Sequence, residues 1–226
     1  MKYRLFDNFN NGTINVAWGQ HKGVGTNLLV TEAPATPNRW PDRQFGSSTR
    51  ALRVRLDEND PYVAGGPRSE LVGPKASGYW GNGDRIYIHA KIFFANNYVN
   101  DPASEIVFQV HYAAVGVPFI LYSVDNILQI TGKGFGDVNV NKTKGEWLTF
   151  ELYQTYSDNA AGSTRVLMNG VTKVNATGIT NMDVGEELYP NFGIYKPAWK
   201  FPLVEPISIV SNRELYYDQI KITLNV

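Results

Sequence analysis

The chain has 226 residues, with 21 basic and 21 acidic side chains and no cysteine. This length fits one large all-β domain, and the lack of cysteine excludes disulfides, thiolate metal sites and a cysteine nucleophile. The balanced charge argues against a nucleic-acid-binding surface. The sequence contains no run of about 18 apolar residues, so no membrane span is expected. Aromatic residues make up 13% of the chain, and their flat faces serve both sugar-binding clefts and ordinary β cores.

Short alternating segments rich in Val, Ile, Tyr and Phe recur between clusters of Gly, Asn, Asp and Pro, a pattern that predicts β-strands. The expected strands are residues 50–56, 85–94, 105–112, 118–124, 147–156, 163–169, 190–196 and 215–225. The pair Asn169-Gly170 predicts a two-residue hairpin turn, because both residues tolerate positive φ. Residues 96–104 and 197–212 are expected to be long loops. The pattern favours a single all-β domain over residues 1–226, a two-sheet, concanavalin-like β-jelly-roll sandwich with a concave groove.

The segment EIVFQVHY (105–112) carries an amide and an imidazole within an apolar run. Side chains alternate across a strand, so Gln109 and His111 share one face. The same alternation places Glu105 and Val107 with them, and Ile106, Phe108 and Val110 on the core face. Taken alone, the segment fits a strand whose polar face meets water better than one that holds two reactive groups.

Two further segments place polar groups on one strand face. In GGPRSELVG (65–73), Arg68 and Glu70 share a face, as either a surface ion pair or a guanidinium that Glu70 orients toward a ligand carboxylate. In YPNFGIYKPAW (189–199), the residues that share a face are Tyr189, Asn191, Gly193 and Tyr195, with Phe192 and Ile194 toward the core. A glycine between two tyrosines leaves space for a close approach to the sheet.

These motifs, Arg-Ser-Glu-Leu, Gln-x-His and Tyr-x-x-x-Gly-Ile-Tyr, resemble in this order those of jelly-roll polysaccharide lyases, including alginate lyases. The wider layout is similar to the group that contains glucuronan lyase and heparin lyase I, through residues 79–94, 192–199 and 213–222. The resemblance covers roughly residues 45 to 224. Val110 stands where several relatives of that group carry Trp, a departure that concerns the subgroup because Val110 faces the core.

The resemblance implies β-elimination in a 1,4-linked polyuronide, without a catalytic metal. Gln109 and Arg68 would neutralise the substrate carboxylate, with Asn191 as a third group, since preorganised donors there are the largest expected contribution. Tyr195 would act as base and acid where proton and leaving oxygen lie on the same side of the ring, helped by a nearby cation from His111, Lys196 or Arg68. His111 is the alternative base, above all for guluronate or iduronate.

Further residues are expected around the substrate. The substrate-binding set consists of Glu70, Asn191, Tyr189, Lys196, Arg43, Lys200 and Trp199, with Arg39, Lys75 and Tyr98 as additional candidates. Trp80 and Tyr79 fit core packing better, and His21 and His89 fit structural roles. Asp7, Asn8 and Asp218 could supply oxygens to a structural calcium, although turn and strand-end residues without a metal explain them equally well.

The expected substrate is an acidic polysaccharide, with glucuronan first, alginate second and sulfated chains third. An endo-acting monomer is expected, secreted or periplasmic, although residues 1–12 lack the apolar core of a secretion signal. It would bind neither nucleic acid nor membrane. The alternative is a non-catalytic, lectin-like carbohydrate-binding module, because a sandwich fold does not settle function. A glycoside hydrolase would need two paired carboxylates, which no predicted strand offers.

Overall fold

The computed structural model describes residues 4–34, 49–73, 80–114, 116–201, 203–204 and 206–225. Strands dominate these ranges. The elements in chain order are β1 (Arg4–Asp7), β2 (Gly19–Lys22), the 3-10 turn η1 (Gly25–Asn27), β3 (Leu28–Glu32), β4 (Arg50–Asp57), β5 (Arg68–Val72), β6 (Arg85–Phe93), β7 (Glu105–Tyr112), β8 (Phe119–Val124), β9 (Ile127–Gly132), β10 (Phe135–Asn141), β11 (Trp147–Thr155), β12 (Gly162–Met168), β13 (Val171–Ile179), β14 (Leu188–Tyr195), α1 (Pro197–Lys200) and β15 (Asn212–Leu224).

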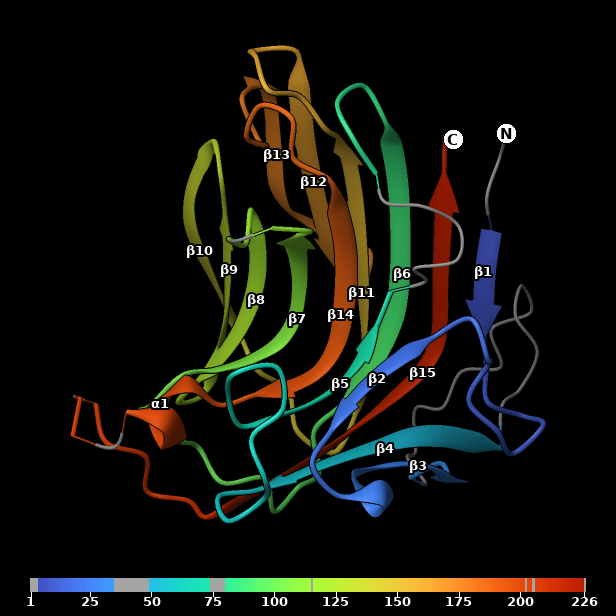
Figure 1. The fold of residues 1–226 in the computed structure, drawn as a ribbon, viewed down its shortest axis with the longest axis vertical. Coiled ribbons are helices and arrows are strands. Elements are labelled where there is room, and N and C mark those ends of the chain that lie inside the picture. Colours follow the sequence, from blue (N-terminus) through green and yellow to red (C-terminus); the bar gives the residue numbers. More distant parts are fainter. Residues whose placement is uncertain are drawn as a thin grey trace.

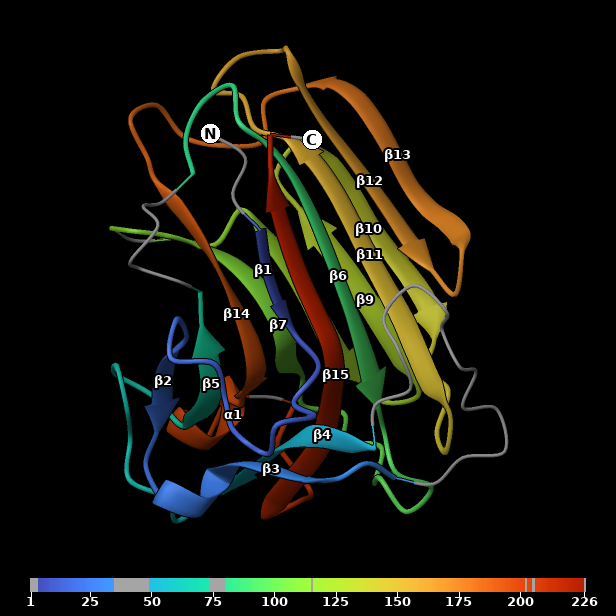
Figure 2. The same cartoon turned by 90° about the vertical axis from the view of Figure 1, so that its right-hand side faces the viewer.

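The strands form two antiparallel sheets that pack face to face (Figure 1). One sheet has eight strands in the order β13-β12-β11-β6-β15-β4-β3, with β1 also paired to β15. The other has seven strands in the order β10-β9-β8-β7-β14-β5-β2. Strands β1 and β15 run side by side, with Arg4 opposite Thr223 (Figure 2). The predicted all-β jelly-roll sandwich is confirmed.

The core lies between the sheets and is built from alternate residues of both. Phe108 of β7 illustrates it, because its ring centroid lies 4.8 Å from that of Phe192 on the same sheet and 5.1 Å from that of Phe150 on the other. Trp80 is buried and stacks on Tyr156 at 6.2 Å, which confirms its assignment to the core. Burial of such aromatic side chains contributes the largest share of the packing energy.

Most predicted strands are present with boundaries within a few residues. The hairpin turn is confirmed, since Asn169 and Gly170 have φ of 50° and 75° and connect β12 to β13. The strands that the sequence did not single out are β1, β2, β3, β9, β10 and most of β13. The second expected loop begins with the short helix α1. No helix within the described ranges is both long and apolar enough to cross a membrane.

Candidate active site

Strand β14 lies between β7 and β5, and its register brings the three sequence motifs together. Directly paired residues of antiparallel strands share one face of a sheet. On the face turned away from the core, the pairs are Tyr195 with Arg68, Gly193 with Glu70, Asn191 with Gln109, and Tyr189 with His111. We call this surface the outer face of the seven-stranded sheet. Strand β2 adds His21 beside Glu70, a residue that the sequence analysis had set aside because a four-residue strand gives little pattern.

A register shift in β7 decides which of its side chains reach this face. The pairing with β8 shifts between Ile106 and Phe108, so that Val107 is an additional residue, as in a β-bulge. Val107 packs in the core, and Glu105 accepts hydrogen bonds from Arg213 of the other sheet. The prediction that Glu105 and Val107 share the face of the Gln-His pair is therefore wrong, because it assumed unbroken alternation.

Gly193 permits a close approach to the sheet, and the group that approaches is the backbone of the neighbouring strand β5. Its φ is 155°, and the register of β14 against β7 shifts between Phe192 and Tyr195. A Cβ at this position would lie 2.1 Å from the carbonyl oxygen of Ser69. Only glycine therefore lets β14 approach β5 closely enough to align the two motifs.

A buried carboxylate organises the centre of the site. Glu70 is 1% exposed, accepts a 2.7 Å hydrogen bond from Gln109 Nε2, and lies 3.4 Å from Arg68 Nη1. Burial raises the pKa of Glu70 to about 7, against the opposing effects of Arg68 and Gln109. A strongly perturbed carboxyl group beside a specific charge partner is typical of functional sites. Glu70 fixes the Gln109 amide and holds the guanidinium of Arg68.

Replacing Glu70 by Gln is expected to change how stability depends on pH. The pKa of Glu70 is raised on folding to about 7, so its contribution to stability is fully present below the ordinary carboxyl pKa and is lost as pH rises through 7. The full loss is about 3 kcal/mol, and a glutamine cannot undergo it. Urea unfolding at about pH 4 and about pH 8 measures the difference between variant and wild type. A difference that stays constant across this range would contradict the raised pKa.

The ring of Tyr195 is held between a cation and the backbone. The Arg68 guanidinium lies 4.1 Å from the ring centroid, a favourable cation–π contact. A Cβ on Gly66 would lie 2.8 Å from Tyr195 Cε2, so the glycine of the preceding loop leaves room for the ring. Of the three cations that the sequence analysis considered for Tyr195, Arg68 is the one that contacts it.

His111 is oriented by a backbone carbonyl. Its Nδ1 lies 2.5 Å from the Tyr112 oxygen, and a carbonyl can only accept, so Nδ1 carries the proton. In the neutral ring, Nε2 then keeps a lone pair, as a general base requires. The ring lies 5.5 Å from that of Tyr189, with 28° between the planes, so Tyr189 supports the imidazole.

Two amides lie at the floor of the site. Gln109 and Asn191 are each 1% exposed and face each other across β7 and β14. Neither amide atom of Asn191 has a hydrogen-bond partner among the described residues, although buried polar groups are normally satisfied. Around this floor, His111, Tyr189, Tyr195 and Arg68 are partly exposed.

The prediction that Lys196 contacts substrate is wrong. The residue is fully buried, and its Nζ lies 2.7 Å from Asp101 Oδ2 and donates to the carbonyl oxygen of Ala103. Burial lowers the pKa of Lys196. Because β14 ends at Tyr195, strand alternation no longer decides where the next side chain points, and Lys196 turns inward to an ion pair.

The other predicted contacts are scattered. Trp199 is partly buried and donates through Nε1 to Ser208 Oγ and the Val210 carbonyl oxygen, each at 3.1 Å, whereas Lys200 is exposed. Tyr98 is 6% exposed and donates to Glu105, so its predicted sugar contact is wrong. Arg43, Arg39, Lys75 and Tyr79 lie outside the described residues.

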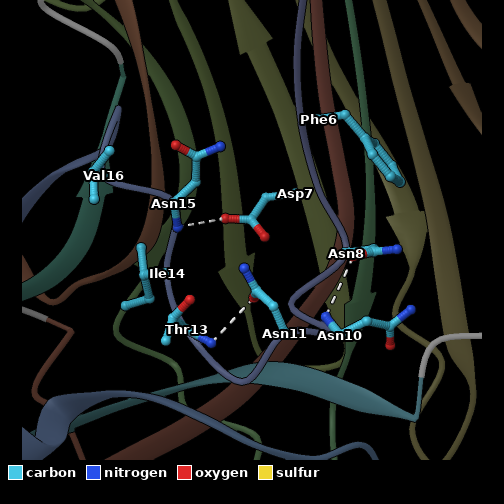
Figure 3. A pocket seen from close by; sticks show the side chains of 9 residues that line it. All are labelled: Phe6, Asp7, Asn8, Asn10, Asn11, Thr13, Ile14, Asn15 and Val16. Carbon is cyan, nitrogen blue, oxygen red and sulfur yellow. Dashed lines mark hydrogen bonds between the residues drawn. The ribbon is translucent and has the colours of Figure 1, made fainter.

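The calcium prediction falls on a polar pocket of about 490 Å³ beside β1 (Figure 3). Asp7 and Asn8 line it together with asparagines, but Asp218 is not among its lining residues. The Asp7 carboxylate already accepts backbone N–H groups of Phe9 at 3.0 Å and Asn15 at 2.9 Å, and burial raises its pKa. Calcium takes six to eight oxygens, so a site here would draw on one carboxylate and amide oxygens. A structural calcium at Asp7, Asn8 and Asp218 stays a prediction.

Fold and site together define a class: a jelly-roll sandwich whose outer sheet face holds a phenol, an imidazole and buried amides around an Arg–Glu pair. The chain belongs to the polysaccharide lyase family, whose family model matches residues 9–221. The chain matches no curated protein.

Solved structures similar to this chain share its fold at low sequence identity. An endo-β-1,4-glucuronan lyase from the fungus Trichoderma reesei has a TM-score of 0.72 and 14% identity, over 96% of this chain and 94% of that one. The alginate lyase from Corynebacterium sp. has a TM-score of 0.61 and 15% identity, over 92% and 93%. The cellulose-induced protein Cip1 has a TM-score of 0.61 and 12% identity, over 96% of both chains.

Proposed function

We propose that this lyase cleaves a 1,4-linked, uronate-containing polysaccharide by β-elimination. A base removes the proton on carbon five of the uronate, the electron pair forms a double bond between carbons four and five, and the bond from carbon four to the glycosidic oxygen breaks. That oxygen takes a proton and leaves as a new hydroxyl group. The products are an unsaturated uronate at the new non-reducing end and a shortened chain, and no water is consumed.

The observation that carries this proposal is the arrangement around the two buried amides. Loss of the carbon-five proton requires that the neighbouring carboxylate be neutralised, and preorganised hydrogen-bond donors in a water-poor site do this best. Gln109 and Asn191 provide amide N–H groups there, and the unpartnered amide of Asn191 is free to bind a carboxylate. Because Arg68 is engaged by Glu70 and the Tyr195 ring, we assign it to positioning Tyr195 as well as to charge.

Tyr195 and His111 lie on opposite sides of these amides along the strands. Asn191 is paired with Gln109, Tyr189 with His111, and Tyr195 with Ile106. A uronate whose carboxylate binds the amides would therefore have the phenol toward one end and the imidazole toward the other. Such a pair can supply both a base and an acid, which general acid–base catalysis requires.

Among polymers made of uronates alone, glucuronan is our first candidate substrate and alginate the second. The sequence motifs support this order, and so does the higher TM-score with a glucuronan lyase than with an alginate lyase. The deciding experiment incubates the protein with a panel of uronate-containing polysaccharides and follows ultraviolet absorbance of the conjugated double bond. Unsaturated product from at least one polymer is expected. Binding without such product would overturn the proposal in favour of a carbohydrate-binding module, and reducing ends without unsaturation would indicate a hydrolase.

A further inference from the structure

Charge is distributed unevenly over the seven-stranded sheet. Strands β8, β9 and β10 contain neither Lys nor Arg, and Asp137 is their only charged residue. All three strands lie within the described part of the chain. They adjoin β7 in the sheet order, so the surface next to Gln109 and His111 has no cation of its own.

The outer face of these three strands carries groups of another kind. Ile120 pairs with Gln109 on one side and with Thr131 on the other, and Tyr122 pairs with Gln129. Asn139 pairs with Gln129 from the far strand. Three strand spacings of about 4.8 Å, roughly 14 Å in all, separate β7 from β10. This surface is wide enough to contact sugar residues beyond the one that is cleaved.

Asp137 lies on β10, the edge strand of the sheet, and its carboxylate is held in place by residues of β9. Its two carboxylate oxygens accept hydrogen bonds from Gln129 Nε2 and Thr131 Oγ1, each at 2.9 Å. Burial, and to a smaller extent the negative charge of Asp137, raises the pKa of Tyr122. Asp137 and Asn139 are exposed, and Tyr122, Gln129 and Thr131 are partly exposed.

Two lysines on the connecting turns are engaged elsewhere. Lys133, between β9 and β10, forms an ion pair with Asp183 and donates to the Met182 carbonyl oxygen. Lys142, at the end of β10, is buried and donates to Ser123 Oγ at 3.0 Å and to the Asp125 carbonyl oxygen at 2.6 Å. A substrate carboxylate over β8–β10 would therefore face Asp137 without a compensating charge from either of these lysines.

We propose that the subsites over β8–β10 bind uncharged sugar residues, and that the preferred substrate is a heteropolysaccharide in which neutral sugars adjoin the 1,4-linked uronate that is cleaved. This inference rests on the proposed β-elimination at the Gln109–Asn191 amides. Hydroxyl groups of a neutral sugar can donate to Asp137 and bond with the amides of Gln129 and Asn139. The apolar face of a sugar ring can pack on Tyr122, whose ring combines a flat face with a polar tip.

Defined oligosaccharides of equal length test the substrate preference. Each carries a uronate at the cleaved position. In the first chain the sugars on both sides of it are neutral, in the second and third only those on the non-reducing or on the reducing side are neutral, and in the fourth all sugars are uronates. We expect kcat/KM for the best mixed substrate to exceed that for the all-uronate chain by at least about fivefold, as one unscreened like-charge contact implies. Equal or faster cleavage of the all-uronate chain would overturn the inference while leaving β-elimination in place. Absence of unsaturated product from every chain would refute the proposed function instead.

Variants at Asp137 test the surface directly. Asp137→Asn keeps an acceptor and removes the charge, and is expected to raise kcat/KM for the all-uronate chain several-fold, with Asp137→Lys raising it further. Both gains should shrink at high salt, and neither variant should gain on the mixed substrate. Glu32→Lys, at an exposed end of β3 in the other sheet, is the control for net charge. The surface over β8–β10 is not a subsite if Glu32→Lys changes the ratio of kcat/KM values for the mixed and all-uronate chains as much as the Asp137 variants do. The same conclusion follows if the Asp137 variants leave this ratio unchanged while their melting temperatures stay at the wild-type value.

Discussion

Replacing Tyr195 by Phe is expected to abolish formation of unsaturated product. The change removes one hydroxyl group and leaves the ring between Arg68 and Gly66 in place, so that the fold should be retained. A general acid or base contributes typically about 10²- to 10⁴-fold to a rate. A residue that both takes the carbon-five proton and protonates the leaving oxygen contributes twice, so the loss should reach the upper end of this range or beyond. The measurement is the rate of ultraviolet absorbance increase at saturating polymer, with circular dichroism as the check on folding.

Tyr153→Phe is the matched control for this prediction. Tyr153 lies on β11 in the eight-stranded sheet, is 38% exposed and donates to Glu151 through the same kind of hydroxyl group. Its replacement should leave the rate unchanged. A Tyr195→Phe variant that keeps near-wild-type activity would remove Tyr195 from the chemistry, whatever its binding affinity. Retained binding of polymer by the inactive variant would show that the loss concerns the reaction and not the assembly of the site.

The sequence predicts which face each site residue occupies, but not which strands lie side by side. Alternation alone puts Gln109 with His111, and Tyr189 with Asn191 and Tyr195. It contains no information on the order β7-β14-β5, which joins segments that are at least 76 positions apart. The resemblance to lyases predicts that these strands are neighbours, because the three motifs can form one active site only if they lie together in the fold.

The errors have local physical causes. A single additional residue at Val107 reverses the alternation of β7, and nothing in the run Ile-Val-Phe marks the bulge, since all three residues suit a strand. Lys196 was assigned to substrate because its charge suits a polyanion. Its partner Asp101 lies 95 positions earlier in the chain, and a buried ion pair of that kind is invisible to any local pattern. The sequence does not indicate that Asp137 lies on the same sheet face as Gln109, because the pattern does not predict strands β9 and β10.

Replacing His111 by Ala is expected to distinguish two stereochemical courses of the elimination. In glucuronate and mannuronate, the carbon-five proton and the leaving oxygen lie on the same side of the ring, so one group can serve both. In guluronate and iduronate they lie on opposite sides, and two groups are needed. Because the register places His111 and Tyr195 at opposite ends of the amide pair, the structure can serve the second course as well as the first. The His111→Ala variant should therefore lose activity on mannuronate chains and on guluronate chains. The loss on guluronate chains should be at least about tenfold larger, within the range that one general base provides.

His111→Gln distinguishes a role of the imidazole as base from a purely structural role of the side chain. Glutamine can still donate to the Tyr112 carbonyl, as Nδ1 of His111 does, but its amide is no base at neutral pH. If the imidazole acts as base, this variant should be as inactive on guluronate chains as His111→Ala. Recovery of activity by glutamine would mean that His111 only shapes the site, for instance by keeping Tyr189 in position, and that Tyr195 alone moves the protons. Equal losses on guluronate and mannuronate chains would likewise speak against His111 as the base for opposite-side elimination, since a residue needed only for binding has no reason to separate these two carbon-five epimers.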